Sequence, residues 1–255
     1  MSTTVSVDGG SANIKVYGNG TVYAGNGNDT ISITGRGTVQ AGNGNDSVYV
    51  GGKGHITVGG GHDTITLLGS GAIDEIGKSG RDTITLGHGS DTIFEAGHAT
   101  VHGAFGTASI SGGTLAFLNT SSGHHIEEAL SGQATLAGGS HANEFIGGTG
   151  TTKMIGGTRP DTFVGGSGNE TMTGGSSTNL FAFEGKVGGK HIITNFVSGQ
   201  DHLYLEGHSL SYLEQHHDVS VSGGNTFIKL DGGHTVIELK GVTDLDASDI
   251  TKHKP

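Results

Sequence analysis

The sequence predicts an all-β fold, a parallel β-roll or β-helix solenoid with a C-terminal β end-piece. Three observations predict it: abundant glycine, short runs of strand-forming residues, and a turn-plus-strand unit that recurs at a fixed spacing. The stretch AGNGNDTISI at 24–33 returns seventeen residues later as AGNGNDSVYV, and again as VGGGHDTITL at 58–67. Gly and Asn tolerate the left-handed backbone of tight turns, whereas TISI, SVYV and TITL alternate as strands do.

The composition narrows the class of protein further. The 255 residues include 51 Gly, 2 Pro, 9 Phe, 5 Tyr and no Trp, and β-formers separate the glycines regularly, which argues against collagen and against a flexible linker. A hydrophobic content of 32% favours a thin core shared along a stack over one thick core. The net charge of −11 disfavours nucleic acid and anionic membranes as partners and favours a cation.

The absence of cysteine excludes disulfides and thiolate metal sites. The first residues, MSTTVSVDGG, show neither the charged nor the apolar region of a signal peptide, and no apolar run approaches transmembrane length. We therefore expect no transmembrane segment and, if the protein is exported, no cleaved leader.

The strand spacing predicts a coil of seventeen residues. Apolar residues that begin short strands are separated by nine and eight residues in alternation. They are Val5, Ile14, Val22, Ile31, Val39, Val48, Ile56, Ile65 and Ile73. A solenoid must keep such a period because each coil stacks on the one before it, and its parallel strands bury one row of Val and Ile per face. After Ile73 the step lengthens to eleven, which indicates one bulged or looped-out coil before Ile84.

The repeat divides the chain into four predicted segments. A first β-roll with seventeen-residue coils covers 1–111, an irregular connector covers 112–135, a second, degenerate β-roll covers 136–183, and a compact C-terminal capping module covers 184–255. The second roll has a strict nine-residue period. Its repeat position is held in turn by Asn143, Thr152, Asp161, Glu170 and Asn179.

The turns of the first roll predict calcium sites. Calcium takes six to eight oxygen ligands, and a turn of Gly, Asn and Gly can point successive carbonyls inward because no Cβ blocks the approach. One turn cannot enclose the ion, so each ion is expected between two stacked turns, as between those ending at Asp29 and Asp46. The shorter half-step carries no acid, so one edge should bind metal well. The candidate metal residues there are Gly25, Asn26, Gly27, Asp29, Gly42, Asn43, Gly44, Asp46, Gly59, Gly61 and Asp63.

Three further aspartates are weaker candidates. Asp82 and Asp91 sit in recognisable turns but are nine residues apart, so we expect them on opposite edges. Asp161 has Asn143 and Asn179 as its same-edge neighbours, so a site there is expected to be weak or empty. One alternative stays open for all of these residues: Asp and Asn side chains also satisfy turn backbones by hydrogen bonding, without any metal.

The turns also resemble a known family. The pattern G-G-x-G-x-D-x-U-x looks like the calcium-binding repeat of RTX (repeats-in-toxin) proteins, with GGTRPDTFV at 156–164 as an example. The C-terminal part resembles a serralysin-type module, and NTFIKLDGGHTVIELKGVTDLDASDI resembles a type I secretion target region. The resemblance implies a parallel β-roll, Ca²⁺ in the turns, and export by the type I secretion machinery.

We expect a non-enzymatic, secreted, calcium-binding β-roll protein that acts as an extracellular structural, matrix or surface-associated component. The sequence contains no recognisable nucleophile with its base, no acid–base pair and no catalytic metal motif. Its expected partners are calcium, the secretion machinery, and an extracellular polysaccharide or cell surface. The alternatives are a non-catalytic RTX accessory module of a polysaccharide-modifying or other secreted enzyme, and a glycan- or ice-binding solenoid. Fifteen scattered histidines leave a secondary transition-metal site open.

Overall fold

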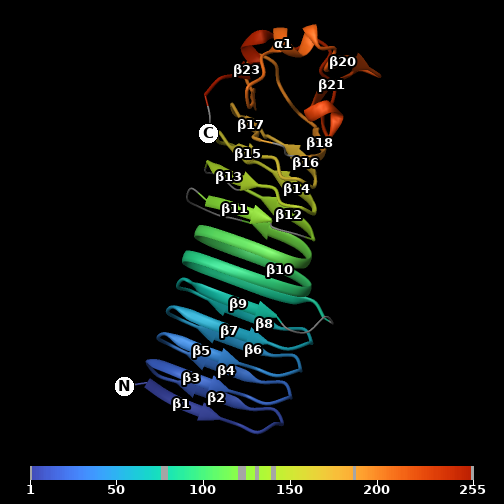
Figure 1. The fold of residues 1–255 in the computed structure, drawn as a ribbon. Helices are drawn as coiled ribbons and strands as arrows, with labels where there is room; N and C mark the ends of the chain where they lie inside the picture. Colours follow the sequence, from blue (N-terminus) through green and yellow to red (C-terminus); the bar gives the residue numbers. More distant parts are fainter. Residues whose placement is uncertain are drawn as a thin grey trace. The chain divides into compact units, whose positions relative to one another are not determined.

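The computed structural model describes two compact units. It covers residues 2–75, 80–119, 125–129, 132–138, 142–185 and 188–253. The units are Met1–Ser121 and Ser122–Pro255, and each is built from coils of parallel β-strands (Figure 1). The all-β solenoid predicted from the repeat is therefore confirmed. Among the described residues, no helix is long and apolar enough to cross a membrane.

In the first unit each coil contributes one strand to each of two parallel sheets. The first sheet runs β1 (Ser2–Ser6), β3 (Asn19–Tyr23), β5 (Gly37–Gln40), β7 (Gly54–Val58) and β9 (Gly71–Glu75). The second runs β2 (Asn13–Val16), β4 (Thr30–Ile33), β6 (Ser47–Val50) and β8 (Thr64–Leu67). The long strand β10 (Asp82–Asn119) winds around the coil, because it pairs first with β8 and then with β9.

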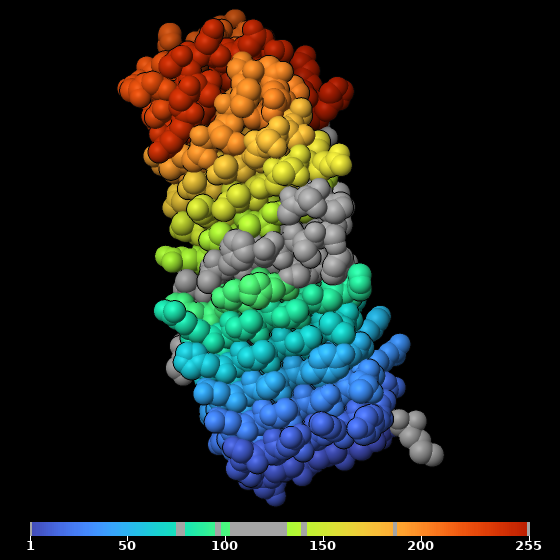
Figure 2. All heavy atoms as spheres, turned by 180° about the vertical axis from the view of Figure 1, so that it is seen from behind, coloured from blue at the N-terminus to red at the C-terminus, as the bar shows by residue number. Residues whose placement is uncertain are grey.

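The core of the first unit consists of aliphatic side chains in register. Ile14, Ile31, Val48 and Ile65 pair strand to strand in the second sheet and are buried. A second buried row follows two residues later, with Val16, Ile33, Val50 and Leu67. The expectation of one row per face is therefore wrong for this sheet, because positions i and i+2 of a strand point to the same side. Successive coils of this unit lie against one another in layers (Figure 2).

The longer step predicted between Ile73 and Ile84 centres on residues 76–79, which lie outside the described residues. Beyond it, Ile84 aligns with Ile65 and Ile93 aligns with Ile73. The coil register therefore resumes on both sheets after the longer step.

The second unit continues the same two-sheet plan. One sheet runs β11 (His125–Ala129), β13 (Asn143–Ile146), β15 (Thr162–Val164), β17 (Leu180–Phe183), β19 (His202–Leu205) and β23 (Ile250–Thr251). The other runs β12 (Gln133–Ala137), β14 (Thr151–Ile155), β16 (Asn169–Thr173), β18 (Gly189–Ile193) and β22 (Thr235–Leu239). Antiparallel β21 (Asn225–Leu230) and β20 (Val219–Ser222) extend this second sheet.

Three short helical elements accompany the terminal strands. They are α1 (Leu210–Gln215) and the 3₁₀ turns η1 (Asp231–Gly233) and η2 (Ala247–Asp249). Within 112–135, expected to be an irregular connector, the described residues lie in strands: the end of β10, all of β11 and the start of β12. A stacked parallel neighbour offers backbone hydrogen bonds to any sequence, which explains strands where the sequence period is lost.

Aromatic side chains fill the core of the second unit. The rings of Phe145, Phe163 and Phe181 stack on one another with centroids 5.0 and 4.9 Å apart, and all three are fully buried. Phe196 extends the row with its centroid 6.1 Å from that of Phe181. Phenylalanine brings much more apolar area into the core per coil than valine does. The second unit therefore has a thicker core than the first.

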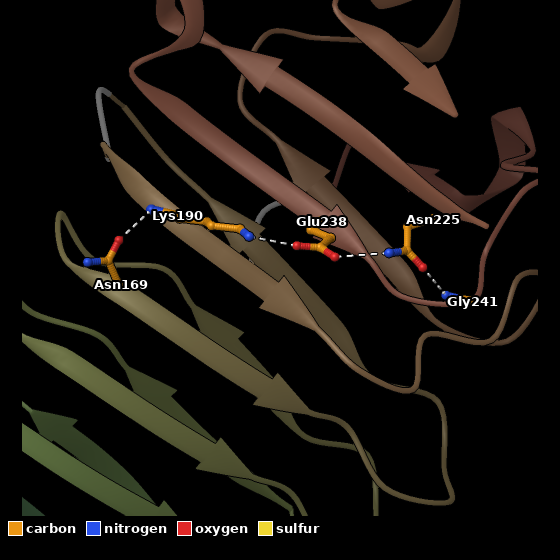
Figure 3. A network of polar contacts seen from close by, with 5 residues as sticks. All are labelled: Asn169, Lys190, Asn225, Glu238 and Gly241. Atoms are coloured by element: carbon orange, nitrogen blue, oxygen red, sulfur yellow. Dashed lines mark hydrogen bonds and ion pairs between the residues drawn. The ribbon is translucent and has the colours of Figure 1, made fainter. Parts of the chain in front are cut away.

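A chain of polar contacts joins the solenoid strands to the terminal antiparallel strands (Figure 3). The Lys190 ammonium lies 2.8 Å from a carboxylate oxygen of Glu238, and the amide of Asn225 donates to the other oxygen at 3.0 Å. The hydrogen-bonded Lys190 ammonium lowers the pKa of Glu238, since it stabilises the charged carboxylate. The residues expected to form an end-piece thus also complete the two parallel sheets.

The phenylalanine stack predicts a stability difference between buried and exposed rings. Phe163→Ala should lower the free energy of unfolding of the second unit by about 3 to 5 kcal/mol, because it leaves a cavity between two stacked rings. Phe94, which is 51% exposed, provides the control, since Phe94→Ala should change stability by no more than about 0.5 kcal/mol. Urea unfolding followed by circular dichroism measures both values, and equal effects of the two variants would contradict the described core.

Candidate metal centre

Four aspartates form a continuous rank along one edge of the first unit. Asp29, Asp46, Asp63 and Asp82 precede or begin β4, β6, β8 and β10, and each is at most 3% exposed. Because the strands they lead into are paired in register, the carboxylates of successive coils lie one above the other. We call these four residues the Asp rank. The structure thus brings together the acids that the sequence predicted for this edge and adds Asp82 to them.

Each carboxylate of the Asp rank holds the backbone of the coil before it. The Oδ1 atom of Asp46 accepts a hydrogen bond from the backbone N–H of Asp29 at 2.8 Å. Asp63 does the same for Asp46 at 2.8 Å, and Asp82 for Asp63 at 2.6 Å. The ladder ends at Ala12, whose N–H donates to Asp29 at 2.8 Å. One oxygen of each acid is therefore used inside the protein.

The second carboxylate oxygens of Asp29 and Asp46 are the atoms that point to a bound cation. The Oδ2 atoms of Asp29 and Asp46 are buried and have no hydrogen-bond partner among the described residues. Burial raises the pKa of Asp46, the hydrogen bond from the Asp29 backbone lowers it, and the nearby Asp29 carboxylate raises it. Buried carboxylates are normally paired or coordinate a metal, so this arrangement favours a cation at the rank.

Glycine allows the turns beside the Asp rank to stack backbone on backbone. Gly27, Gly44 and Gly61 have backbone φ angles of +139°, +143° and +148°, which L-residues with a side chain rarely adopt. A Cβ at Gly44 would collide with the carbonyl oxygen of Gly27, and one at Gly61 with that of Gly44. Gly25, Gly42 and Gly59 form a second row of this kind, since a Cβ at Gly42 or Gly59 would lie 2.5 Å from the carbonyl oxygen of the glycine one coil earlier. Backbone oxygens thus approach from adjacent turns.

The asparagines of these turns accept hydrogen bonds from neighbouring turns, through both their side-chain and their main-chain oxygens. The side-chain oxygen of Asn26 accepts from the N–H of Asn43 at 3.0 Å, and that of Asn43 accepts from Gly60 at 3.0 Å. Their main-chain carbonyls accept from Gly10 at 2.9 Å and from Gly27 at 2.8 Å. The turn-forming alternative therefore accounts for the Asn side chains and for one oxygen of each Asp, but it does not account for the buried Oδ2 atoms of Asp29 and Asp46, which have no hydrogen-bond partner among the described residues.

The donor set fits calcium. Among the described residues no three His, Cys, Asp or Glu side chains gather where they could hold one ion, so a transition-metal centre finds no support there. At the Asp rank two carboxylates from neighbouring coils would be completed by backbone carbonyls, and calcium prefers such an all-oxygen set. Asp29 with Asp46, and Asp46 with Asp63, would hold the ions, together with carbonyl oxygens of the glycine turns.

Asp91 lies on the opposite edge, as its nine-residue separation from Asp82 predicts. Its Oδ1 accepts from the N–H of Gly71 at 2.9 Å, and its Oδ2 is buried without a hydrogen-bond partner in the part of the chain that the structure describes. Ser70 occupies the turn one coil earlier. Asp91 therefore meets no acid in that coil.

Asp161 is already saturated by the protein. Its Oδ1 accepts from the N–H of Asn143 at 2.8 Å and from the amide of Asn143 at 3.0 Å, and its Oδ2 accepts from the N–H of Gly157 at 2.8 Å. The next acid of this edge, Asp201, was not predicted as a site residue. The signal for it was present in SGQDHLYL, where an aspartate again follows a glycine turn and precedes a strand.

The position of Asp91 predicts a dependence of stability on pH. Burial raises the pKa of Asp91 from 3.8 to about 6, and the hydrogen bond from Gly71 opposes that rise only in part. The folded state therefore keeps the proton that the unfolded chain loses first, so the stabilising contribution is full below pH 4 and is lost as the pH rises through about 6.

The expected size of this effect is at most about 3 kcal/mol. Thermal unfolding at one fixed, saturating calcium concentration and at pH 4 to 7 measures it for the parent and for Asp91→Asn, which keeps the acceptor and removes the charge. The advantage of the variant should grow across this range. A difference between parent and variant that is the same at pH 4 and pH 7 would contradict the burial of this carboxyl.

Comparison with known proteins agrees with this geometry. The model of the RTX calcium-binding nonapeptide repeat (4 copies) matches residues 16–32, 76–94 and 146–180, which include Asp29, Asp82, Asp91 and Asp161. No curated protein matches the chain. The chain thus carries RTX calcium-binding repeats on a parallel β-solenoid.

Proposed function

We propose that the chain is a secreted, non-enzymatic β-roll protein that folds on binding calcium after type I export and serves as an extracellular structural, matrix or surface-associated component. The observation that carries the proposal is the Asp rank, in which Asp29 and Asp46 each keep one buried oxygen that has no hydrogen-bond donor in the part of the chain that the structure describes. A cation that binds the folded state alone stabilises it by mass action.

Repulsion between the carboxylates of the Asp rank makes folding of the first unit depend on calcium. Carboxylates stacked at one strand spacing, about 4.8 Å, repel one another, and the glycine-rich turns lose much conformational entropy when they are ordered. Without calcium both effects oppose folding of the first unit. Where calcium is scarce the net charge of −11 also favours an extended chain, a state suited to export.

Export and the absence of catalysis rest on the sequence. The resemblance of the last third of the chain to a type I secretion target region supports export. The proposal of a non-enzymatic protein rests on the sequence, which contains neither a recognisable nucleophile with its base nor a catalytic metal motif. An extracellular structural role follows from a calcium-rigidified solenoid that presents two long faces.

The Asp rank predicts unequal effects of its members on calcium-dependent folding. Asp46 has an acid on both sides, whereas Asp29 has Ala12 on one side. Asp46→Ala should therefore raise the calcium midpoint of folding more than Asp29→Ala does. The parent midpoint is expected at roughly 10⁻⁴ to 10⁻³ M, as for extracellular calcium modules. Circular dichroism during a calcium titration that starts in chelator measures the midpoints of the parent, of Asp46→Ala and of Asp29→Ala.

Asp8 provides the control for net charge. It is an exposed acid of the same unit, so Asp8→Ala should leave the midpoint unchanged. If the first unit keeps its full β signal in chelator, or if Asp46→Ala and Asp8→Ala behave alike, the acids are turn formers only and the calcium proposal is wrong.

A hollow on the edge opposite the Asp rank favours a second candidate function, binding of an anionic glycan. The hollow measures about 380 Å³, and the side chains of Arg36 and Lys53 line it together with Thr21 and Thr38. Thr21 and Thr38 are paired residues of neighbouring strands, so they repeat at the strand spacing. Two cations with hydroxyls at one regular spacing suit a linear polysaccharide that carries repeated carboxylates.

The hollow predicts salt-dependent retention on an immobilised polyuronate. The double variant Arg36→Gln, Lys53→Gln should elute at lower salt than the parent, because it loses both cations of the hollow. The matched control Lys15→Gln, Arg81→Gln removes the same charge elsewhere in the first unit and should elute with the parent. Equal weakening by both double variants would show attraction by overall charge and would sink the glycan function.

A further inference from the structure

The second unit repeats the geometry of the Asp rank with different chemistry. Asn143, Asp161, Asn179 and Asp201 follow one another along one edge, each preceding or beginning a strand of the sheet β13–β15–β17–β19. We call them the Asn–Asp rank. The backbone ladder is the same, since the N–H of Asn143, Asp161 and Asn179 donates to the Oδ1 atom one coil later at 2.8, 3.1 and 2.8 Å. Every second carboxylate is replaced by an amide.

The amides donate where the first unit has only acceptors. The Nδ2 atom of Asn143 lies 3.0 Å from Oδ1 of Asp161, and that of Asn179 lies 3.1 Å from Oδ1 of Asp201. The Oδ2 atoms accept from the backbone N–H of Gly157 at 2.8 Å and of Val197 at 2.9 Å. Each carboxylate thus accepts three hydrogen bonds and has an amide as its nearest neighbour of the rank, instead of a second negative charge.

The opposite edge of the second unit sets a histidine beside its acid. Glu170 ends the repeat GGSGNE and pairs in register with His191 of the next coil, and both side chains are fully buried. The Nδ1 atom of His191 lies 2.5 Å from Oε2 of Glu170, and its Nε2 atom lies 2.7 Å from the carbonyl oxygen of Gly188. A carbonyl only accepts, so Nε2 carries a hydrogen. The carboxylate on this edge has fewer hydrogen-bond donors than those of the Asn–Asp rank, because Oε1 of Glu170 has no hydrogen-bond partner among the described residues.

We infer that Asn143 and Asn179 stand in for calcium, so that the Asn–Asp rank folds without the ion and the calcium requirement is confined to the first unit. This departs from the match of residues 146–180 to a calcium-binding repeat, because both carboxylate oxygens of Asp161 already accept hydrogen bonds from the protein. The stacked Phe145, Phe163 and Phe181 add apolar burial that opposes the entropy of ordering. The inference deepens the proposed function and rests on it for the first unit alone.

Hydrogen exchange of the full chain, read by mass spectrometry, tests the inference region by region. In chelator, peptides from β13 to β19 should stay protected while peptides from β2 to β8 exchange, and millimolar calcium should protect β2 to β8 as well. If β13 to β19 become protected only when calcium is added, the inference is wrong. If β2 to β8 are already protected in chelator, the proposed calcium-dependent folding fails while the inference about the Asn–Asp rank stands.

Substitution of one amide tests the mechanism. Asn179→Asp would place three carboxylates in sequence at residues 161, 179 and 201, so protection of β15 to β19 in chelator should fall on the order of tenfold or more and calcium should restore it. Asn169→Asp is the matched control. Asn169 is exposed and its side-chain oxygen accepts from the N–H of Lys190 at 2.9 Å, an acceptor that Asp retains (Figure 3).

The reciprocal change in the first unit completes the test. Asp46→Asn would create the order Asp, Asn, Asp that the second unit uses, so β4 to β8 should gain protection in chelator, whereas Asp46→Ala should stay unprotected like the parent. Both variants lack the charge of Asp46, and only one supplies an amide. An Asp46→Asn variant that gains no more protection in chelator than Asp46→Ala, or an Asn179→Asp variant that stays protected in chelator and does not respond to calcium, would overturn the inference.

Discussion

The direct stacking of equivalent residues in successive coils is the constraint on which the rest of the structure depends. A parallel solenoid brings each residue within about 4.8 Å of its equivalents above and below. Apolar residues gain from this, since rows of valine, isoleucine or phenylalanine bury one another. Carboxylates do not, because like charges at that spacing repel in a partly dry environment. An acid at a repeated position therefore demands a partner at every step of the stack.

The two units meet that demand differently. In the first unit each aspartate satisfies the backbone of the preceding coil with one oxygen, and for Asp29 and Asp46 the second oxygen is buried without a protein donor. In the second unit Asn143 and Asn179 alternate with the aspartates and donate to them. The backbone ladder is common to both, so the difference lies in the side chains alone. We propose that a cation is needed where acids follow acids, whereas the protein itself supplies the donor where amides intervene.

The turns impose a second constraint. Adjacent turns approach so closely that a Cβ at Gly44 or Gly61 would collide with a carbonyl oxygen of the turn before it. Glycine makes the approach sterically allowed but raises the entropy lost on folding. The first unit, with a core of aliphatic rows, has less apolar burial to set against that loss than the second unit, with its stacked phenylalanines. We propose that glycine turns and a core of aliphatic rows together make folding of the first unit depend on a bound ion.

Sequence alone determined the parts of this protein that follow from period and residue type. The spacing of nine and eight predicted the coil, the two sheets and the register of buried rows such as Ile14, Ile31, Val48 and Ile65, because a repeat of that length can bury its apolar residues only by stacking. It also predicted that Asp29, Asp46 and Asp63 share one edge and that Asp91 lies on the other. These are statements about position along a periodic chain.

Only the tertiary structure decided which atoms of those residues meet. The period could not show that one oxygen of each aspartate is taken by the preceding backbone, that Asp82 joins the Asp rank after an irregular step, or that Asp201 closes the Asn–Asp rank twenty-two residues after Asn179. Nor could it show that Asn143 donates to Asp161, since an asparagine side chain donates or accepts according to what lies beside it. Hydrogen bonding depends on distances of a few tenths of an ångström between coils, and those are set by packing.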